Sequence, residues 1–140
     1  MGRKRIKYLH NAKETELLGR EFAHTCTILA LQGDLGAGKT TFVQGLAKEL
    51  GIREVLQSPT FTFCQIYEGS CELVHFDLYR LNKESDFLLL GFEEQFDSKG
   101  IVVIEWPERI ATLIPKTALL VTLAHSGEGR TATIQSWEQR

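Results

Sequence analysis

One short stretch of the chain has the residue types and the spacing of a phosphate-binding loop. Residues 33–40 match the pattern G-x-x-x-x-G-K-[S/T] at every fixed position. The glycines allow successive backbone N–H groups to turn inward, and a helix that follows adds about half a positive charge at its N-terminus. Because Lys39 adds a full positive charge, the stretch predicts a cradle for a polyphosphate. The predicted contacts come from Gly33, Asp34, Leu35, Gly36, Ala37, Gly38, Lys39, Thr40 and Thr41.

A site of this kind needs a metal ion and acidic side chains beside the loop. The Thr40 hydroxyl is expected to bind a Mg²⁺ ion that bridges the outer phosphates of a nucleotide. The other metal-side group is usually a carboxylate that ends a neighbouring apolar strand. Asp77 follows the apolar run 73–76 and Glu105 follows 101–104, so both carboxylates are expected at one sheet edge. Lys39, Asp77 and Glu105 are therefore the predicted catalytic residues.

Two neighbours of these carboxylates leave more than one role open. His75 lies two residues before Asp77 and therefore on the same face of the strand, which makes a His-x-Asp metal pair conceivable. Trp106, directly after Glu105, could be a core or rim aromatic, or could stack on a base or a partner. The spacing alone does not choose among these roles.

Helical and strand patterns alternate along the chain and place the polar residues at strand ends. Apolar residues recur at helical spacing in 14–23 and 39–50, and Gly51 follows the second segment as a stop signal. Buried strands are predicted at 27–32, directly before the glycine-rich loop, and at 101–104. In such sheets, ligands bind at the carboxyl ends of the strands. The remaining predicted elements are strands at 60–67 and 72–76, helices at 82–90 and 93–97, and a closing hairpin of 117–125 with 131–137.

These elements predict an α/β fold over residues 1–140: a single P-loop NTPase-like domain with a mostly parallel sheet flanked by helices and a C-terminal β-hairpin. A length of 140 residues suits one domain. With 43% apolar and 24% charged residues, the composition excludes disordered and collagen-like chains. The basic cluster at 3–7, within a possible flexible segment 1–11, is expected to be a solvated tail, with contact to RNA or a partner as the alternative.

Charge, hydropathy and cysteine content exclude further classes. The formal charge is −2, whereas a protein that binds nucleic acid by electrostatics alone usually has a large excess of basic residues. The longest apolar runs have four residues, far below the ~20 that cross a bilayer, so no membrane association and a cytoplasmic location are expected. The three cysteines fit neither a disulfide framework nor a metal knuckle, and reduced thiols in or near the core are expected.

Other nucleotide-dependent functions compete with hydrolysis. A small kinase would need an acceptor pocket and an arginine-rich lid, for which little sequence remains after the loop and its helix. A GTPase would need an N-K-x-D motif, and the nearest match at 82–85 ends in Ser85. A non-catalytic module that uses nucleotide only to set its shape is disfavoured by the two carboxylates, but it stays open.

Four motifs in order make the chain resemble the TsaE (YjeE) family of bacterial P-loop ATPases. Besides the loop at 33–42, they are Ser-Pro-Thr-Phe-Thr at 58–62, His-Phe-Asp-Leu-Tyr-Arg-Leu at 75–81 and Glu-Trp-Pro-Glu at 105–108. The resemblance covers about residues 12–135. It implies a Mg²⁺-dependent ATPase that acts with the TsaD and TsaB proteins in making threonylcarbamoyladenosine beside the anticodon of tRNA, with tRNA contacted indirectly through that complex.

The resemblance also implies a role for each matching position. Lys39 and Thr40 would hold the phosphates and Mg²⁺. Glu105 would be the metal-side acid, and Asp77 a second acid in hydrolysis. The remaining positions are Thr60 and Thr62, in a switch segment that senses the terminal phosphate, and Trp106, near the nucleotide.

Overall fold

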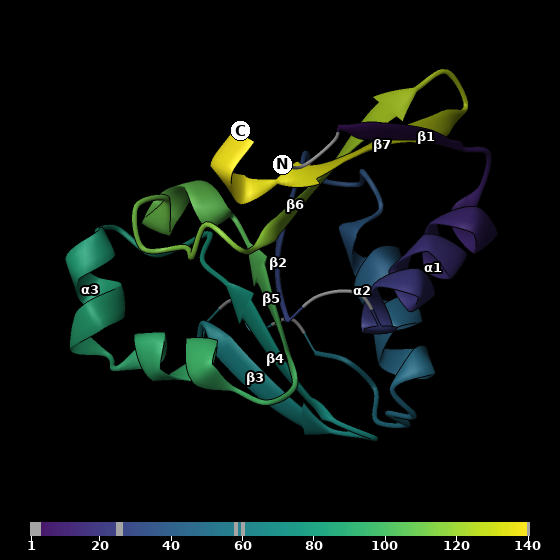
Figure 1. Ribbon diagram of the computed structural model, residues 1–140. Helices are drawn as coiled ribbons and strands as arrows, with labels where there is room; N and C mark the ends of the chain where they lie inside the picture. Colours follow the sequence, from purple (N-terminus) through teal and green to yellow (C-terminus); the bar gives the residue numbers. More distant parts are fainter. Residues whose placement is uncertain (1–3, 25–26, 58, 60, 140) are drawn as a thin grey trace.

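A single mixed sheet runs through the part of the chain that the structure describes. The structure is a computed structural model, and it describes residues 4–24, 27–57, 59 and 61–139. Its strands are β1 (Arg5–Leu9), β2 (Ile28–Gly33), β3 (Cys64–Glu68), β4 (Glu72–Asp77), β5 (Ile101–Glu105), β6 (Leu119–Ser126) and β7 (Gly129–Ser136). Their order across the sheet is β1-β7-β6-β2-β5-β4-β3 (Figure 1). The four strands β6, β2, β5 and β4 are parallel, whereas β3, β7 and β1 pair antiparallel with their neighbours.

Helices cover both faces of this sheet. The α-helices are α1 (Ala12–Glu21), α2 (Lys39–Glu49) and α3 (Glu84–Leu89), and short 3₁₀ helices cover Phe22–His24, Phe92–Asp97, Pro107–Ile110 and Trp137–Gln139. In Figure 1, α1 and α2 lie on one side of the sheet, and α3 lies on the other. The predicted α/β class, with parallel inner strands, flanking helices and a closing hairpin, is therefore confirmed.

Each face of the sheet has its own apolar core, because the central strands are apolar on both faces. On β2, Leu29 and Leu31 pack in the cluster that includes Leu46 of α2. The alternate residue Ala30 packs instead in the cluster that includes Phe87 of α3. All five of these side chains are completely buried, so the sheet and its flanking helices form a rigid platform for the loop after β2.

Three local predictions are wrong in detail. The strand predicted at 60–67 begins only at Cys64, and Phe63 before it has a φ of 65°, a left-handed backbone that does not continue a strand. Helix α3 spans only Glu84–Leu89, with Lys83 as its N-cap, and is therefore shorter than the helix predicted over 82–90. Leu17 is one of the apolar residues that recur at helical spacing in 14–23, but 48% of its surface is exposed.

The basic N-terminal segment is part of the sheet, which corrects the prediction of a flexible tail over its described part. Strand β1 pairs antiparallel with β7, from Arg5 beside Ile134 to Leu9 beside Arg130. Leu9 is fully buried, whereas the other β1 side chains are exposed. Charged residues on an edge strand discourage pairing with other chains, so the basic residues mark a protected sheet edge.

Two glycines allow α1 and α2 to pack at close range. A Cβ on Gly19 would overlap the carbonyl oxygen of Phe42, and a Cβ on Gly45 would overlap the carbonyl oxygen of Glu16. Ion pairs join the same helices at their surface, Glu16 with Lys48 and Arg20 with Glu49. Since Lys39 begins α2, this contact also fixes the helix that presents the predicted phosphate loop.

Gly45→Ala is therefore expected to destabilise the fold by about 1–3 kcal/mol, the usual cost of overpacking a tight contact. Alanine favours an α-helix by about 1 kcal/mol over glycine, so the backbone overlap must outweigh that gain. Urea unfolding measures the difference. Gln44→Ala, at an exposed position of the same helix, should stay within about 0.5 kcal/mol of wild type. A more stable Gly45→Ala protein would show that the two helices are not in close contact.

Cys64 and Cys71 are half-buried free thiols, as predicted, whereas Cys26 lies outside the described residues. Burial raises the pKa of the Cys64 thiol to about 11, with a smaller contribution from the Glu72 carboxylate, so this thiol stays protonated at neutral pH.

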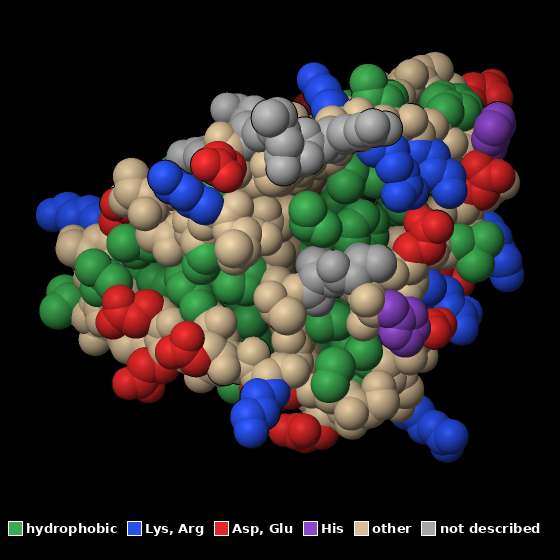
Figure 2. All heavy atoms as spheres, viewed as in Figure 1, with side chains coloured by type: hydrophobic (Ala, Val, Ile, Leu, Met, Phe, Trp, Pro, Cys, Tyr) green, Lys and Arg blue, Asp and Glu red, His purple; other side chains and the backbone are tan. Residues whose placement is uncertain are grey.

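Acidic and basic side chains are interspersed on the face shown in Figure 2, where apolar side chains also reach the surface. Among the described residues, no helix is both long and apolar enough to cross a membrane.

Candidate phosphate-binding site

The glycine-rich loop joins the end of β2 to the start of α2. Gly36 and Gly38 have φ angles of 79° and 105°, a region that side-chain-bearing residues rarely adopt. Gly33 lies so close to β6 that a Cβ would overlap the carbonyl oxygen of Leu123. The first N–H groups of a helix have no partner inside it, and they carry a partial positive charge. The loop and the start of α2 therefore offer backbone donors and a partial positive charge that suit an anion.

A cavity of about 660 Å³ opens between this loop, the ends of β4 and β5, and the segment that follows α2. The parallel register of the sheet places Asp77 beside Glu105 at those strand ends. On the side of β5 away from Asp77, Glu105 is aligned with Leu31 of β2. Leu31 lies two residues before the loop begins. The sheet thus carries both predicted carboxylates to the mouth of the loop, as the strand pattern indicates.

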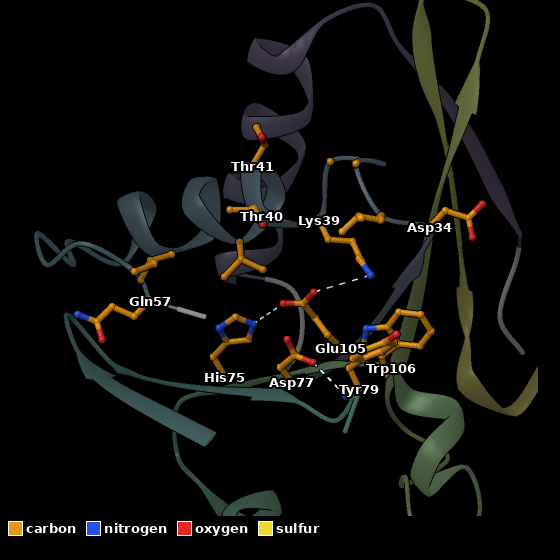
Figure 3. A pocket seen from close by; sticks show the side chains of 15 residues that line it. Asp34, Lys39, Thr40, Thr41, Gln57, His75, Asp77, Tyr79, Glu105 and Trp106 are labelled. Atoms are coloured by element: carbon orange, nitrogen blue, oxygen red, sulfur yellow. Dashed lines mark hydrogen bonds and ion pairs between the residues drawn. The ribbon is translucent and has the colours of Figure 1, made fainter. Parts of the chain in front are cut away.

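A chain of polar contacts crosses this cavity (Figure 3). The Lys39 Nζ lies 4.0 Å from the Glu105 Oε1, and these two side chains are only 10% and 12% exposed. The other Glu105 oxygen, Oε2, lies 2.6 Å from the His75 Nε2. Because an ionised carboxylate only accepts hydrogen bonds, Nε2 must carry the hydrogen in this pair. His75 thereby fixes the orientation of the carboxylate, and Glu105 holds the lysine ammonium within the cavity.

Trp106 shapes the other side of the lysine. Its φ of 59° turns the chain sharply from β5 into the 3₁₀ helix that starts at Pro107. The Lys39 Nζ lies 4.8 Å from the centroid of the Trp106 ring, within the range of a cation–π contact. The Tyr79 ring packs against Trp106, with 4.9 Å between centroids. Trp106 is therefore a wall of the site.

Asp77 is oriented by the turn that follows β4. The backbone N–H of Tyr79 donates a hydrogen bond of 3.1 Å to the Asp77 Oδ1. The Tyr79 carbonyl in turn accepts a hydrogen bond of 3.1 Å from the Arg109 Nη2. This link ties the turn after β4 to the 3₁₀ helix after β5, so the two carboxyl-bearing strand ends are held together.

The structure brings most of the predicted site residues together. Two are set back from the cavity: Ala37 is fully buried, and Gly33 lines a smaller neighbouring hollow of about 290 Å³. Thr60 lies outside the described residues, and Thr62 is exposed, with its hydroxyl 3.4 Å from the Cys64 carbonyl oxygen. The predicted residues that line the cavity are Asp34, Leu35, Gly36, Gly38, Lys39, Thr40, Thr41, Asp77, Glu105 and Trp106.

Sequence reasoning missed several other residues of the cavity wall. His75 pairs with Glu105, whereas the only role predicted for it from the sequence was a metal pair with Asp77. No cluster of three or more His, Cys, Asp or Glu side chains able to hold a metal occurs among the described residues. The i, i+2 spacing of His75 and Asp77 was the available signal for His75. Tyr79 lies within the motif at 75–81 but had no predicted role, and Val43, Leu56 and Gln57 lie outside all four motifs.

The residues present fit a magnesium-bound polyphosphate. Thr40 supplies a hydroxyl oxygen and Glu105 a carboxylate oxygen, and Mg²⁺ prefers such oxygen ligands while keeping several waters. Lys39 and the start of α2 supply the positive charge that phosphate oxygens need. The nearly buried Lys39–Glu105 pair keeps both side chains in place for these two ligands.

A parallel strand, a glycine-rich loop and a helix, with carboxylates at the ends of adjacent strands, define a P-loop α/β domain. The family model described as "Threonylcarbamoyl adenosine biosynthesis protein TsaE" matches residues 9–133. The chain belongs to this TsaE family. Its relatives are named as tRNA threonylcarbamoyladenosine biosynthesis proteins.

Individual relatives are similar over most of their length. The TsaE protein of Treponema pallidum is 44% identical over 103 residues, which cover 74% of this chain and 76% of that protein. The Bacillus subtilis TsaE protein is 38% identical over 122 residues, covering 84% and 76%. A crystal structure of Bacillus subtilis YdiB superimposes with a TM-score of 0.83 at 30% identity, covering 97% of this chain and 87% of that one.

Proposed function

We propose that the chain binds ATP with Mg²⁺ in this cavity and hydrolyses it, in the service of threonylcarbamoyladenosine formation on tRNA. The observation that carries this proposal is the nearly buried Lys39–Glu105 pair at the mouth of the glycine-rich loop. A buried lysine and a buried carboxylate suit a phosphate and its metal ion, respectively. Family membership supports the tRNA pathway, and we place the reaction in the cytoplasm.

Each residue of the cavity has a proposed part in hydrolysis. The loop N–H groups and Lys39 bind the phosphates, and Thr40 and Glu105 hold Mg²⁺. The ion neutralises charge that develops on the transferred phosphoryl group. His75 keeps Glu105 oriented through its 2.6 Å hydrogen bond. Asp77, at the end of the adjacent strand, orients the attacking water.

A partner is proposed to complete the site. None of the described residues that line the cavity is an arginine, and the Arg80 guanidinium lies over the Phe61 ring at 4.8 Å. The rim is apolar and open, with Leu35 94% and Tyr79 51% exposed. Arginine supplied by a partner can accelerate phosphoryl transfer by about 10³- to 10⁵-fold. We propose that a TsaD–TsaB complex covers the rim and raises turnover.

Steady-state phosphate release from ATP, with and without purified TsaD and TsaB, tests this function. The isolated chain is expected to bind ATP but to hydrolyse it slowly, and the complex is expected to accelerate phosphate release, by up to about 10³- to 10⁵-fold where it supplies an arginine. Omitting Mg²⁺ should abolish release in both cases. Rapid hydrolysis by the isolated chain, unchanged by the complex and tRNA, would favour a self-sufficient NTPase. Phosphate transfer to an added acceptor would favour a kinase.

A further inference from the structure

Arg130, on the C-terminal hairpin, contacts the phosphate-binding loop from outside the cavity. It lies 94 residues from Gly36 in sequence, yet its Nη2 donates a hydrogen bond of 3.0 Å to the Gly36 carbonyl oxygen. Its Nη1 donates a second hydrogen bond of 2.9 Å to the carbonyl oxygen of Gly129. One guanidinium therefore joins the hairpin to the loop that follows β2.

The peptide that Arg130 contacts has little else to hold its carbonyl group. Gly36 has a left-handed backbone, and a Cβ there would meet nothing within 4 Å, so its Cα faces open space. The N–H end of the same peptide, on Ala37, donates a hydrogen bond of 3.0 Å to the Asp34 carbonyl oxygen. With Arg130 at the oxygen end, the Gly36–Ala37 peptide is restrained at both ends. A carbonyl turned into the cavity would repel phosphate oxygens, and this contact opposes that rotation.

The backbone of Arg130 is itself well anchored. Residue 130 pairs with Leu9 of β1 on one side and with His125 of β6 on the other. Leu9 is fully buried at this position, so the edge strand β1 is fixed where it supports Arg130. The buried end of β1 at Leu9 thus contributes indirectly to the position of the guanidinium, whereas Arg5, at the other end of the strand, is paired with Ile134.

The charge of Arg130 has no acidic partner in the described part of the chain. Every ion pair there involves other residues, and the Arg130 Nε is buried without a hydrogen-bond partner. The guanidinium is always protonated, so this positive charge is permanent. A positive charge next to an anion-binding loop, with no described carboxylate within ion-pair distance, favours the bound polyphosphate.

We propose that Arg130 is a positioning residue for the phosphate-binding loop: it restrains the Gly36 carbonyl and strengthens binding of the nucleotide polyphosphate. This inference rests on the proposed nucleotide-binding function. Arg130 lies outside the cavity and does not contact the reacting atoms, so its role is in binding and not in the chemical step.

The test compares three variants in calorimetric titrations with ADP and Mg²⁺. Arg130→Met removes the charge and both donors, and it should raise Kd about tenfold, as expected for a lost charge-assisted hydrogen bond. Arg130→Lys keeps the charge without the two-pronged geometry, and its Kd should lie between those of Arg130→Met and wild type. Arg5→Met, on the exposed edge strand, is the matched control and should leave Kd unchanged.

Thermal unfolding without nucleotide separates binding from folding. A purely structural role would lower the melting temperature of Arg130→Met while leaving Kd within twofold of wild type, and that result would overturn the inference. If Arg130→Met fails to fold, Arg130→Lys decides: a Kd equal to that of wild type overturns the inference, and a raised Kd supports it. Failure of the wild-type chain to bind ADP would instead overturn the proposed function.

Discussion

Lys39→Ala is expected to abolish the stabilisation that ATP and Mg²⁺ give to the fold. At a concentration about 100-fold above Kd, a ligand that binds only the native state adds about 2.7 kcal/mol to its stability. For a domain of this size, that gain raises the melting temperature by several degrees. The wild-type protein should show this rise in a thermal unfolding experiment, and Lys39→Ala should show none, because the lost ammonium faces the cavity beside Glu105.

The apo form of Lys39→Ala provides the control. Its melting temperature should stay close to that of the wild-type protein, since Lys39 begins α2 and projects into the cavity, away from the apolar cores. Lys48→Ala, at the other end of the same helix, should keep the full rise with ATP. Equal nucleotide-induced rises in wild type and Lys39→Ala would mean that the glycine-rich loop is a turn and not a phosphate site.

Removing the charge of Glu105 is expected to impair metal-dependent binding, whereas removing that of Asp77 is expected to impair turnover. Glu105→Gln should weaken the Mg²⁺-dependent part of ATP binding by about 10- to 100-fold or more, since it removes the charge proposed to hold the metal. Asp77→Asn should keep that binding but lower turnover by about 10²- to 10⁴-fold, the usual contribution of a group that positions or deprotonates a nucleophile. Magnesium titrations of ATP affinity and single-turnover phosphate release measure the two effects separately.

The opposite pattern would exchange the roles. If Asp77→Asn abolishes the magnesium dependence of binding while Glu105→Gln leaves it intact, Asp77 is the metal-side acid. Glu93→Gln, on the 3₁₀ helix that follows α3, is the matched control because it removes one exposed carboxylate without touching the cavity. Loss of binding in this control would mean that overall charge, and not the site, sets the affinity.

The sequence was sufficient wherever a residue's role follows from its neighbours along the chain. The loop at 33–40 lies between an apolar strand and an amphipathic helix, and the structure has both elements there. Asp77 and Glu105 each end an apolar run, and the parallel register brings them side by side. These inferences need only local pattern and the rule that parallel strands present their carboxyl ends at one edge.

Contacts between distant segments could not be predicted in the same way. The pairing of His75 with Glu105 depends on which strands are neighbours, and the link from Arg130 to Gly36 depends on how the hairpin is placed beside β2. Strand β1 was not predicted, because the charges of Arg5 and Lys7 are typical of a solvated tail. Only its pairing with β7 shows that it is an edge strand. Each of these features is fixed by tertiary packing and leaves no periodic signal in the sequence.

A structure of the chain bound to a non-hydrolysable ATP analogue and Mg²⁺ would show whether the glycine-rich loop binds the nucleotide. We expect the outer phosphates to accept hydrogen bonds from the loop N–H groups and the Lys39 Nζ, and the ion to contact the Thr40 hydroxyl on the Glu105 side of the cavity. A nucleotide bound elsewhere on the protein, or phosphates held away from Lys39, would contradict this expectation.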